Sequence, residues 1–162
     1  MSLAIVPGSF DPMTLGHLEL IKTVAKRYDE VVVAVMVNRS KKYMFDMETR
    51  VAIAEETVKE LSNVRVIADA GMLIDLFDKL QADAVCKGWR NQRDYDYELH
   101  MADWNSAHNP RFRTEMIHAK NEHAEISSTL VRKKLEQGES LEGLVHPNAA
   151  KLISNITFKK EK

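Results

Sequence analysis

The fold is decided by one stretch of the sequence, Leu3-Ala4-Ile5-Val6-Pro7-Gly8-Ser9-Phe10-Asp11-Pro12-Met13-Thr14-Leu15-Gly16-His17. It begins with a short apolar run and continues as a turn with glycines and prolines. Residues 18–28 then repeat apolar side chains at helical spacing. This order predicts a strand, a turn and a helix. The start of a helix presents unpaired backbone N–H groups and the positive end of a dipole, so the turn is a candidate phosphate site.

Three residues of this turn have properties that suit a phosphate ligand. Thr14 is the expected N-cap of the helix, because its hydroxyl can accept a hydrogen bond from the first backbone N–H groups. Gly16 has no side chain and would let a phosphate approach the backbone closely. His17 lies in the first helical turn and would point a ring N–H at the same place.

Outward from this stretch, apolar runs alternate with segments of helical spacing. We expect further strands at 31–37, 64–67, 84–86 and 114–118, and further helices at 47–61, 72–80, 95–108, 130–137 and 147–155. Regular alternation of strand and helix predicts an α/β fold, namely a Rossmann-like open five-stranded parallel sheet with helices on both faces. A length of 162 residues fits a single domain over 1–162, with 155–162 as a frayed tail.

The composition is that of an ordinary globular protein, 44% hydrophobic and 29% charged, with a formal net charge of -1. This balance argues against a nucleic-acid partner. The single cysteine excludes an internal disulfide and fits a reducing compartment. The sequence shows no signal peptide and no apolar run long enough for a membrane span. We therefore expect a cytoplasmic protein without a membrane partner.

Polar residues follow the predicted strands where each strand ends. Lys41 follows the second strand, Lys87 and Arg90 follow the fourth, and Ser127-Ser128-Thr129 opens a helix after the fifth. The carboxyl ends of parallel strands meet at one edge of a sheet, so these residues and His17 would line a shared crevice. Such a crevice could hold a polyphosphate. Its residues include no obvious activated nucleophile, which favours in-line phosphoryl or nucleotidyl transfer by positioning and charge neutralisation.

Other interpretations of these residues stay open at this point. Lysines and arginines in loops are most often solvated, and Ser127-Ser128-Thr129 can serve as a helix cap alone. Several familiar motifs are absent: the G-x-G-x-x-G fingerprint, the P-loop, the G-x-S-x-G elbow and the H-E-x-x-H zinc motif. A standard dinucleotide site, a P-loop, a hydrolase elbow and a zinc site are therefore not expected.

Several short motifs occur together and in a fixed order. They are Gly8-Ser9-Phe10-Asp11-Pro12, Thr14-x-Gly16-His17, Ser40-Lys41-Lys42, Gly88-x-Arg90, Tyr97-Glu98 and Ile126-Ser127-Ser128-Thr129-Leu130-Val131. With these motifs the chain resembles the bacterial phosphopantetheine adenylyltransferases over nearly its whole length. The Thr-x-Gly-His motif alone would indicate only the wider nucleotidyltransferase superfamily, and the other motifs narrow the resemblance to this family.

The resemblance implies an activity in coenzyme A biosynthesis. ATP and 4′-phosphopantetheine would give dephospho-coenzyme A and pyrophosphate, with Mg2+ accompanying ATP. The acceptor phosphate would attack in line, with no covalent enzyme intermediate. Members of the family are usually homohexamers, so the resemblance also implies that assembly. It gives no metal ligands on the protein.

The resemblance also implies roles for individual residues. His17 would stabilise the α-phosphate, Lys41 would bridge the two reacting phosphates, and Ser9 would help to hold them, which makes these three the catalytic set. The implied ATP-binding residues are Ser9, Phe10, Gly16, His17, Gly88, Arg90, Glu98, Ser127, Ser128 and Thr129. The implied substrate-binding residues are Ser9, Lys41, Met72, Leu73, Lys87, Met101 and Asn105.

The chain departs from the family pattern on the acceptor side. Ser9 replaces the usual threonine, Lys87 the usual arginine, and Trp89 a common leucine. Lysine keeps the charge of arginine but loses its two-pronged recognition of phosphate. Two alternatives therefore remain: a diverged nucleotidyltransferase that uses another acceptor, such as nicotinamide mononucleotide, or CTP; and a nucleotide-binding subunit without catalysis.

Overall fold

The computed structural model describes residues 1–38, 40–118 and 126–160, with residues 157–160 as backbone only. The strands are β1 (Leu3–Gly8), β2 (Glu30–Met36), β3 (Val64–Asp69), β4 (Ala84–Trp89) and β5 (Thr114–His118). The helices are α1 (Leu15–Arg27), α2 (Met47–Val58), α3 (Leu73–Lys79), α4 (Gln92–His108), α5 (Ser128–Glu136) and α6 (Pro147–Lys160). Among these described residues, no helix is both long and apolar enough to cross a membrane.

The five strands form one parallel sheet in the order β3-β2-β1-β4-β5. The predicted fold class is therefore confirmed. The chain winds from β1 towards β3 and then crosses back to β4, so β1 and β4 are neighbours although their connections run in opposite directions. In such sheets ligands bind beside the carboxyl ends of the strands at this point of reversal.

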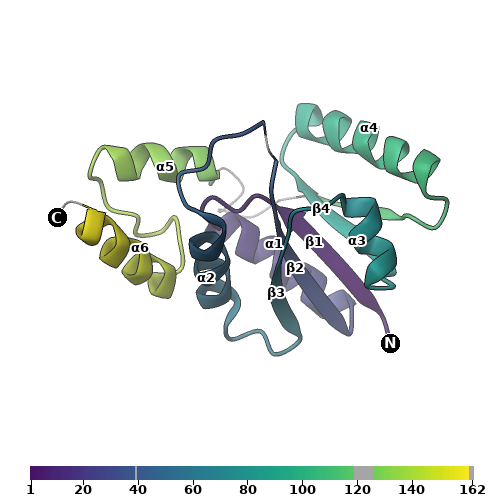
Figure 1. Cartoon of the computed structure of the whole chain (residues 1–162), viewed down its shortest axis with the longest axis horizontal. Coiled ribbons are helices and arrows are strands. Elements are labelled where there is room, and N and C mark those ends of the chain that lie inside the picture. The colour runs from purple at the N-terminus through teal and green to yellow at the C-terminus, as the bar shows by residue number, and fades with distance from the viewer. Residues whose placement is uncertain (39, 119–125, 161–162) are drawn as a thin grey trace.

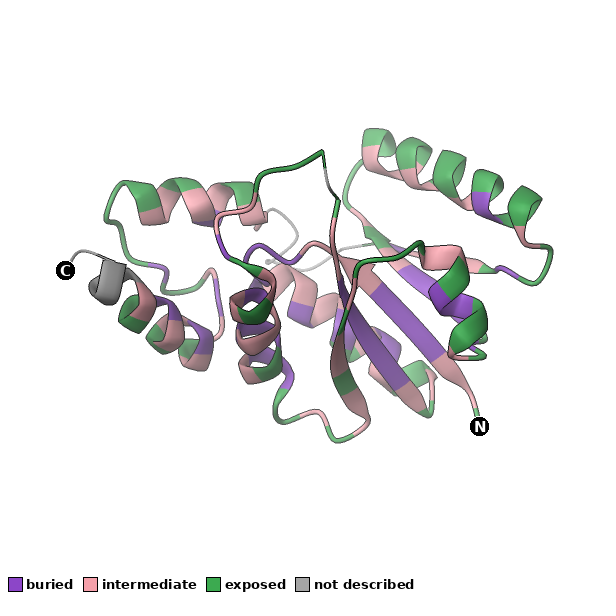
Figure 2. Ribbon diagram, viewed as in Figure 1, coloured by how far each residue is buried: buried purple, intermediate pink, exposed green. Residues whose placement is uncertain are grey.

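Both faces of the sheet are covered, because successive strand side chains point to opposite faces. On one face Ala4 and Val6 pack with buried residues of α1 and α2, and on the other Ile5 packs with residues of α3. A third apolar cluster joins α5 and α6 to α2. Figure 1 shows α5 and α6 at the opposite end of the molecule from α3 and α4, and Figure 2 shows that the central strands are largely buried.

The fourth strand is longer than the sequence predicts. Lys87, Gly88 and Trp89 belong to β4, whereas we expected a loop after 84–86. Their backbone is extended because it pairs with β5, with Trp89 in register with His118. As a result, the side chains of Lys87 and Trp89 are held by a strand.

Several helix bounds also differ from those predicted. The helix α4 begins at Gln92 because the Asn91 side chain caps it, accepting a hydrogen bond from the N–H of Asp94 at 2.9 Å. The helix α6 continues to Lys160 and does not end at 155, with Ile153 buried and Ile156 packed beside the same cluster. The expected frayed tail is thus helical over 155–160, and 161–162 lie outside the described residues.

Candidate active site

A cavity of about 330 Å³ lies where β1 and β4 meet. Its walls are formed by the ends of these two strands, the first turn of α1, parts of α4 and β5, and the residues that lead into α5. Nine of the expected site residues line it: Phe10, Gly16, His17, Lys87, Gly88, Arg90, Glu98, Ser127 and Ser128. The topology thus brings together residues from both halves of the chain, as the common strand edge predicts.

The other expected residues do not line this cavity. Ser9 adjoins the wall in the turn after β1, Lys41 is exposed in the segment that joins β2 to α2, and Thr129 is exposed in α5. Those expected for the pantetheine arm lie at the start of α3 and on α4, and they are Met72, Leu73, Met101 and Asn105. Leu73 packs into the core and Asn105 is buried, whereas Met72 and Met101 are exposed.

His17 is locked to the N-terminus of α1 by a reciprocal cap. The hydroxyl of Thr14 accepts hydrogen bonds from the N–H groups of Gly16 and His17, and the N–H of Thr14 donates to Nδ1 of His17 at 3.0 Å. This confirms Thr14 as the N-cap. A backbone N–H can only donate, so Nδ1 is the acceptor and the proton of the neutral ring sits on Nε2.

The electrostatic surroundings keep His17 neutral. Burial of the ring, with a smaller contribution from the positive charge of Arg90, lowers the pKa of His17 from 6.5 to about 4. The imidazole therefore carries no charge near pH 7. It can offer a hydrogen bond from Nε2–H, and it is a poor general base.

Phe10 holds the His17 ring from a second side. The two rings meet edge to face, with centroids 5.0 Å apart and an interplanar angle of 83°. Phe10 has a φ of 47°, in the left-handed region that residues with a side chain seldom occupy. A Cβ atom on Gly8 would lie 2.9 Å from the Phe10 ring, so glycine is needed there for the ring to fit.

The β4 wall of the cavity carries two charged pairs. The ammonium of Lys87 lies 3.2 Å from Oε2 of Glu98, and Nε of Arg90 lies 3.2 Å from the carboxylate of Asp94. Trp89 stacks on His118, with ring centroids 4.0 Å apart. The two cations that the sequence predicted after the fourth strand thus lie at the cavity, each beside a carboxylate of α4.

The three hydroxyls at the start of α5 all have protein partners. Ser127 caps the helix by accepting from the N–H of Leu130, and Ser128 donates to the carbonyl of Pro12 at 2.8 Å. Thr129 accepts a hydrogen bond from Arg132 at 3.1 Å. Capping thus explains the hydroxyl of Ser127, whereas Ser128 binds α5 to the turn after β1 and Thr129 bonds to Arg132 within the same helix.

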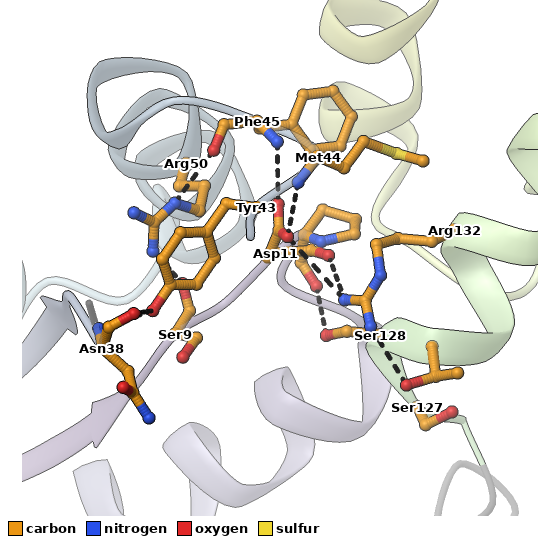
Figure 3. Close-up of polar contacts among 12 residues, drawn as sticks. Ser9, Asp11, Asn38, Tyr43, Met44, Phe45, Arg50, Ser127, Ser128 and Arg132 are labelled. Atoms are coloured by element: carbon orange, nitrogen blue, oxygen red, sulfur yellow. Dashed lines mark hydrogen bonds and ion pairs between the residues drawn. The ribbon is translucent and has the colours of Figure 1, made fainter. Parts of the chain in front are cut away.

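Behind the cavity wall, a polar network supports the turn after β1 (Figure 3). The carboxylate of Asp11 accepts hydrogen bonds from the backbone N–H groups of Met44 and Phe45, at 2.8 and 3.0 Å. Arg132 donates to the carbonyl of Asp11 at 2.7 Å. These contacts connect the turn to the segment before α2 and to α5.

The centre of this network is Arg50, which is only 2% exposed. Its guanidinium donates to the carbonyls of Ser9 (2.8 Å), Phe45 (3.2 Å) and Met36 (3.3 Å), and it lies over the ring of Tyr43. Sequence analysis missed Arg50, Asp11 and Arg132 as parts of the site. Asp11 stood in the motif-bearing turn, which was a usable signal, whereas an arginine within a helix is normally solvated.

The described residues contain no group of three or more His, Cys, Asp or Glu side chains that could hold a metal ion. The cavity lining does include the carboxylates of Glu19, Asp94 and Glu98, but each of them already has an interaction partner in the protein, which is Lys87 for Glu98 and Arg90 for Asp94. A divalent cation at this cavity would accordingly need its ligands from a bound polyphosphate and water.

Comparison with known proteins assigns the chain to a class. The cytidylyltransferase-like family profile matches residues 5–134. A solved structure from Vibrio parahaemolyticus, assigned as a nicotinate-nucleotide adenylyltransferase, superimposes with a TM-score of 0.74 over 96% of this chain and 93% of that one, at 21% identity, which supports the fold. The fold and the family profile are thus those of a nucleotidyltransferase.

Closer relatives identify the family. A phosphopantetheine adenylyltransferase of Limosilactobacillus reuteri is 37% identical over 161 residues, which cover 99% of this chain and 93% of the relative. One from Clostridium kluyveri is 41% identical over 145 residues, which cover 90% of this chain and 88% of the relative. The chain belongs to the phosphopantetheine adenylyltransferase family.

Proposed function

We propose that this chain transfers the adenylyl group of ATP to 4′-phosphopantetheine and so forms dephospho-coenzyme A and pyrophosphate. A phosphate oxygen of the acceptor attacks the α-phosphorus of ATP and forms the new P–O bond. The bond to the bridging oxygen breaks, and pyrophosphate leaves with its electron pair. One observation carries the proposal: in a member of this family, a neutral His17 and two cations face one cavity at the reversal point of the sheet.

His17 stabilises the α-phosphate in this proposal. Its Nε2–H donates to an oxygen on which negative charge develops, and the Thr14 cap fixes the ring before the substrate arrives. A donor that is already in position spends no reorganisation energy during the reaction. The N-terminus of α1, with Gly16 in its first turn, adds backbone N–H groups and a positive dipole end at the same place.

The remaining site residues divide between the two substrates in this proposal. Phe10, Gly16, Gly88, Arg90 and the Ser127–Thr129 segment contact ATP, and Lys87 binds the acceptor phosphate. Lys41 and Ser9 complete the catalytic set, with the flexible stem of Lys41 carrying its ammonium to the two reacting phosphates. Met72, Leu73, Met101 and Asn105 contact the pantetheine arm.

We propose further that Mg2+ enters bound to the phosphates of ATP and lowers their charge. The protein acts in the cytoplasm, which its single cysteine supports. It assembles as a homohexamer. Exposed large apolar side chains support self-association, and they are Met72, Tyr97, Leu99, Met101 and Trp104.

The direct test supplies purified protein with ATP, Mg2+ and 4′-phosphopantetheine and measures pyrophosphate release. Release that depends on the acceptor supports the proposal. Release only with nicotinamide mononucleotide as acceptor, or only with CTP as donor, would select the diverged nucleotidyltransferase. Binding of ATP without turnover on any of these acceptors would select the non-catalytic subunit.

A further inference from the structure

Lys87 and Glu98 meet within the cavity wall. Lys87 is on β4 and Glu98 on α4, the helix that follows that strand. The ammonium nitrogen lies 3.2 Å from Oε2 of Glu98, and the two side chains are 29% and 17% exposed. The family resemblance assigns these residues to different substrates, Lys87 to the acceptor and Glu98 to ATP. The contact between them makes them one unit.

The buried oxygen of Glu98 faces this ammonium. Oε2 has almost no exposed surface and accepts no hydrogen bond from the part of the chain that the structure describes. A carboxylate buried in this way is costly unless a positive charge lies beside it, and Lys87 supplies that charge. Oε2 is thus directed at Lys87.

The chemistry of lysine explains why such a partner is needed here. A lysine side chain has a flexible stem and a point charge, so an ammonium without a second contact samples many positions. The ammonium has three N–H donors, so it can stay paired with the charge of Glu98 and still direct donors at a phosphate. The planar fork of arginine is better organised in advance and depends less on a neighbour.

We propose that Glu98 is a positioning residue that holds the Lys87 ammonium in place for the acceptor phosphate. This proposal rests on the proposed function, in which Lys87 binds that phosphate. It also explains how a lysine serves at a position where arginine is usual. The carboxylate of Glu98 supplies the fixed orientation that the guanidinium fork would otherwise provide.

The test compares steady-state kinetics of Glu98→Gln and Lys87→Met with those of the wild type. In Glu98→Gln we expect the KM for 4′-phosphopantetheine to rise about tenfold, with the KM for ATP changed less than about twofold. In Lys87→Met the acceptor KM also rises. Adding Glu98→Gln to Lys87→Met then has no further effect, because the positioned group is already gone.

A rescue variant separates positioning from general damage to the fold. In a Lys87→Arg background, Glu98→Gln should raise the acceptor KM less than about threefold, since guanidinium is organised by its own geometry. Asp96→Asn is the matched control, because it also removes a carboxylate from α4. The described partner of Asp96 is Gln92, which donates to it. This substitution should leave both KM values unchanged. Glu98→Asp, which keeps the charge but shortens the reach, replaces Glu98→Gln if that variant fails to fold.

Three outcomes would overturn the inference. One is a rise in the KM for ATP with no change for the acceptor. Another is independent, multiplicative effects of the Lys87 and Glu98 substitutions. The third is an equal effect of Glu98→Gln in the lysine and arginine backgrounds. Failure of the proposed function is distinct from all three, because the wild type itself would then release no pyrophosphate with 4′-phosphopantetheine.

Discussion

The backbone N–H of Thr14 donates a hydrogen bond to Nδ1 of His17 at 3.0 Å. This contact fixes which ring nitrogen carries the proton and where that proton points. It also gives the cap of α1 a part in the proposed chemistry, because Thr14, which caps the helix, also orients the ring that we propose as the donor to the α-phosphate. A change at either residue therefore affects both catalysis and the helix start.

Replacing His17 by alanine removes the proposed donor to the α-phosphate. We expect kcat for pyrophosphate release to fall by roughly 10²–10³, as when a fixed oxyanion donor is lost. His100→Ala is a matched control, because His100 is an exposed histidine of α4 away from the described cavity lining. Turnover of His17→Ala close to that of the wild type would show that the role assigned to His17 is wrong.

The depressed pKa of His17 predicts how stability depends on pH. Between pH 6.5 and 4, unfolded chains bind a proton at this residue and folded chains do not. The neutral His17 ring therefore makes its full contribution to the free energy of unfolding above pH 6.5. As the pH falls to 4 the free energy of unfolding decreases by up to about 3 kcal/mol. Denaturant unfolding of wild type and His17→Gln across this range isolates the contribution. Parallel pH profiles for the two proteins would contradict it.

Gly8→Ala should shift the His17 ring indirectly, through the Phe10 ring that packs between the two residues. The added Cβ would lie 2.9 Å from the Phe10 ring, and Phe10 packs edge-on against His17. We expect a loss of about 1–3 kcal/mol in unfolding free energy and a lower kcat. Gly88→Ala on the neighbouring strand β4 is the comparison, because its Cβ meets the flexible end of Leu20 at 3.3 Å. Equal losses in the two variants would mean that Phe10 is not the sensitive contact.

Arg50→Met should be strongly destabilising. It removes the donor to three carbonyls that lie behind the cavity wall, and a buried acceptor without a partner is costly. We expect a loss of about 3 kcal/mol by denaturant unfolding, with Arg50→Lys intermediate. Arg65→Met is the control, since Arg65 forms an exposed pair with Glu30 and should change stability by less than about 1 kcal/mol. Similar losses at the two arginines would refute this account.

The sequence was sufficient for the framework of the fold. Alternation of apolar runs and helical spacing predicted every strand and helix in order, and Thr14 could be recognised as a cap from its place before an amphipathic segment. These features depend on residues that are close in sequence, where periodicity and capping chemistry act directly. The gathering of His17, Lys87 and Arg90 at one edge followed from parallel strands alone, although Lys41 does not line the cavity.

Contacts between distant segments could not be predicted in the same way. Lys87 is a strand residue because of its pairing with β5, and no local pattern records that. Arg50 is buried because carbonyls from three separate segments converge on it. The salt bridge of Lys87 with Glu98 likewise depends on how α4 lies beside β4. Sequence patterns identify the side chains, while their partners follow only from the packing.

The central place of β1 in the sheet has a consequence for how this cavity comes into being during synthesis. Its pairing with β2 uses only the first 36 residues, but the pairing of Ile5 with Val85 waits until β4 has been made. The cavity lies where β1 pairs with β4, which is the pairing that forms late. Its two walls therefore meet only when the long chain segment between these strands closes. A ligand that contacts both β1 and β4 would oppose the separation of these strands. Amide hydrogen exchange in β4 would therefore slow as the ligand concentration rises.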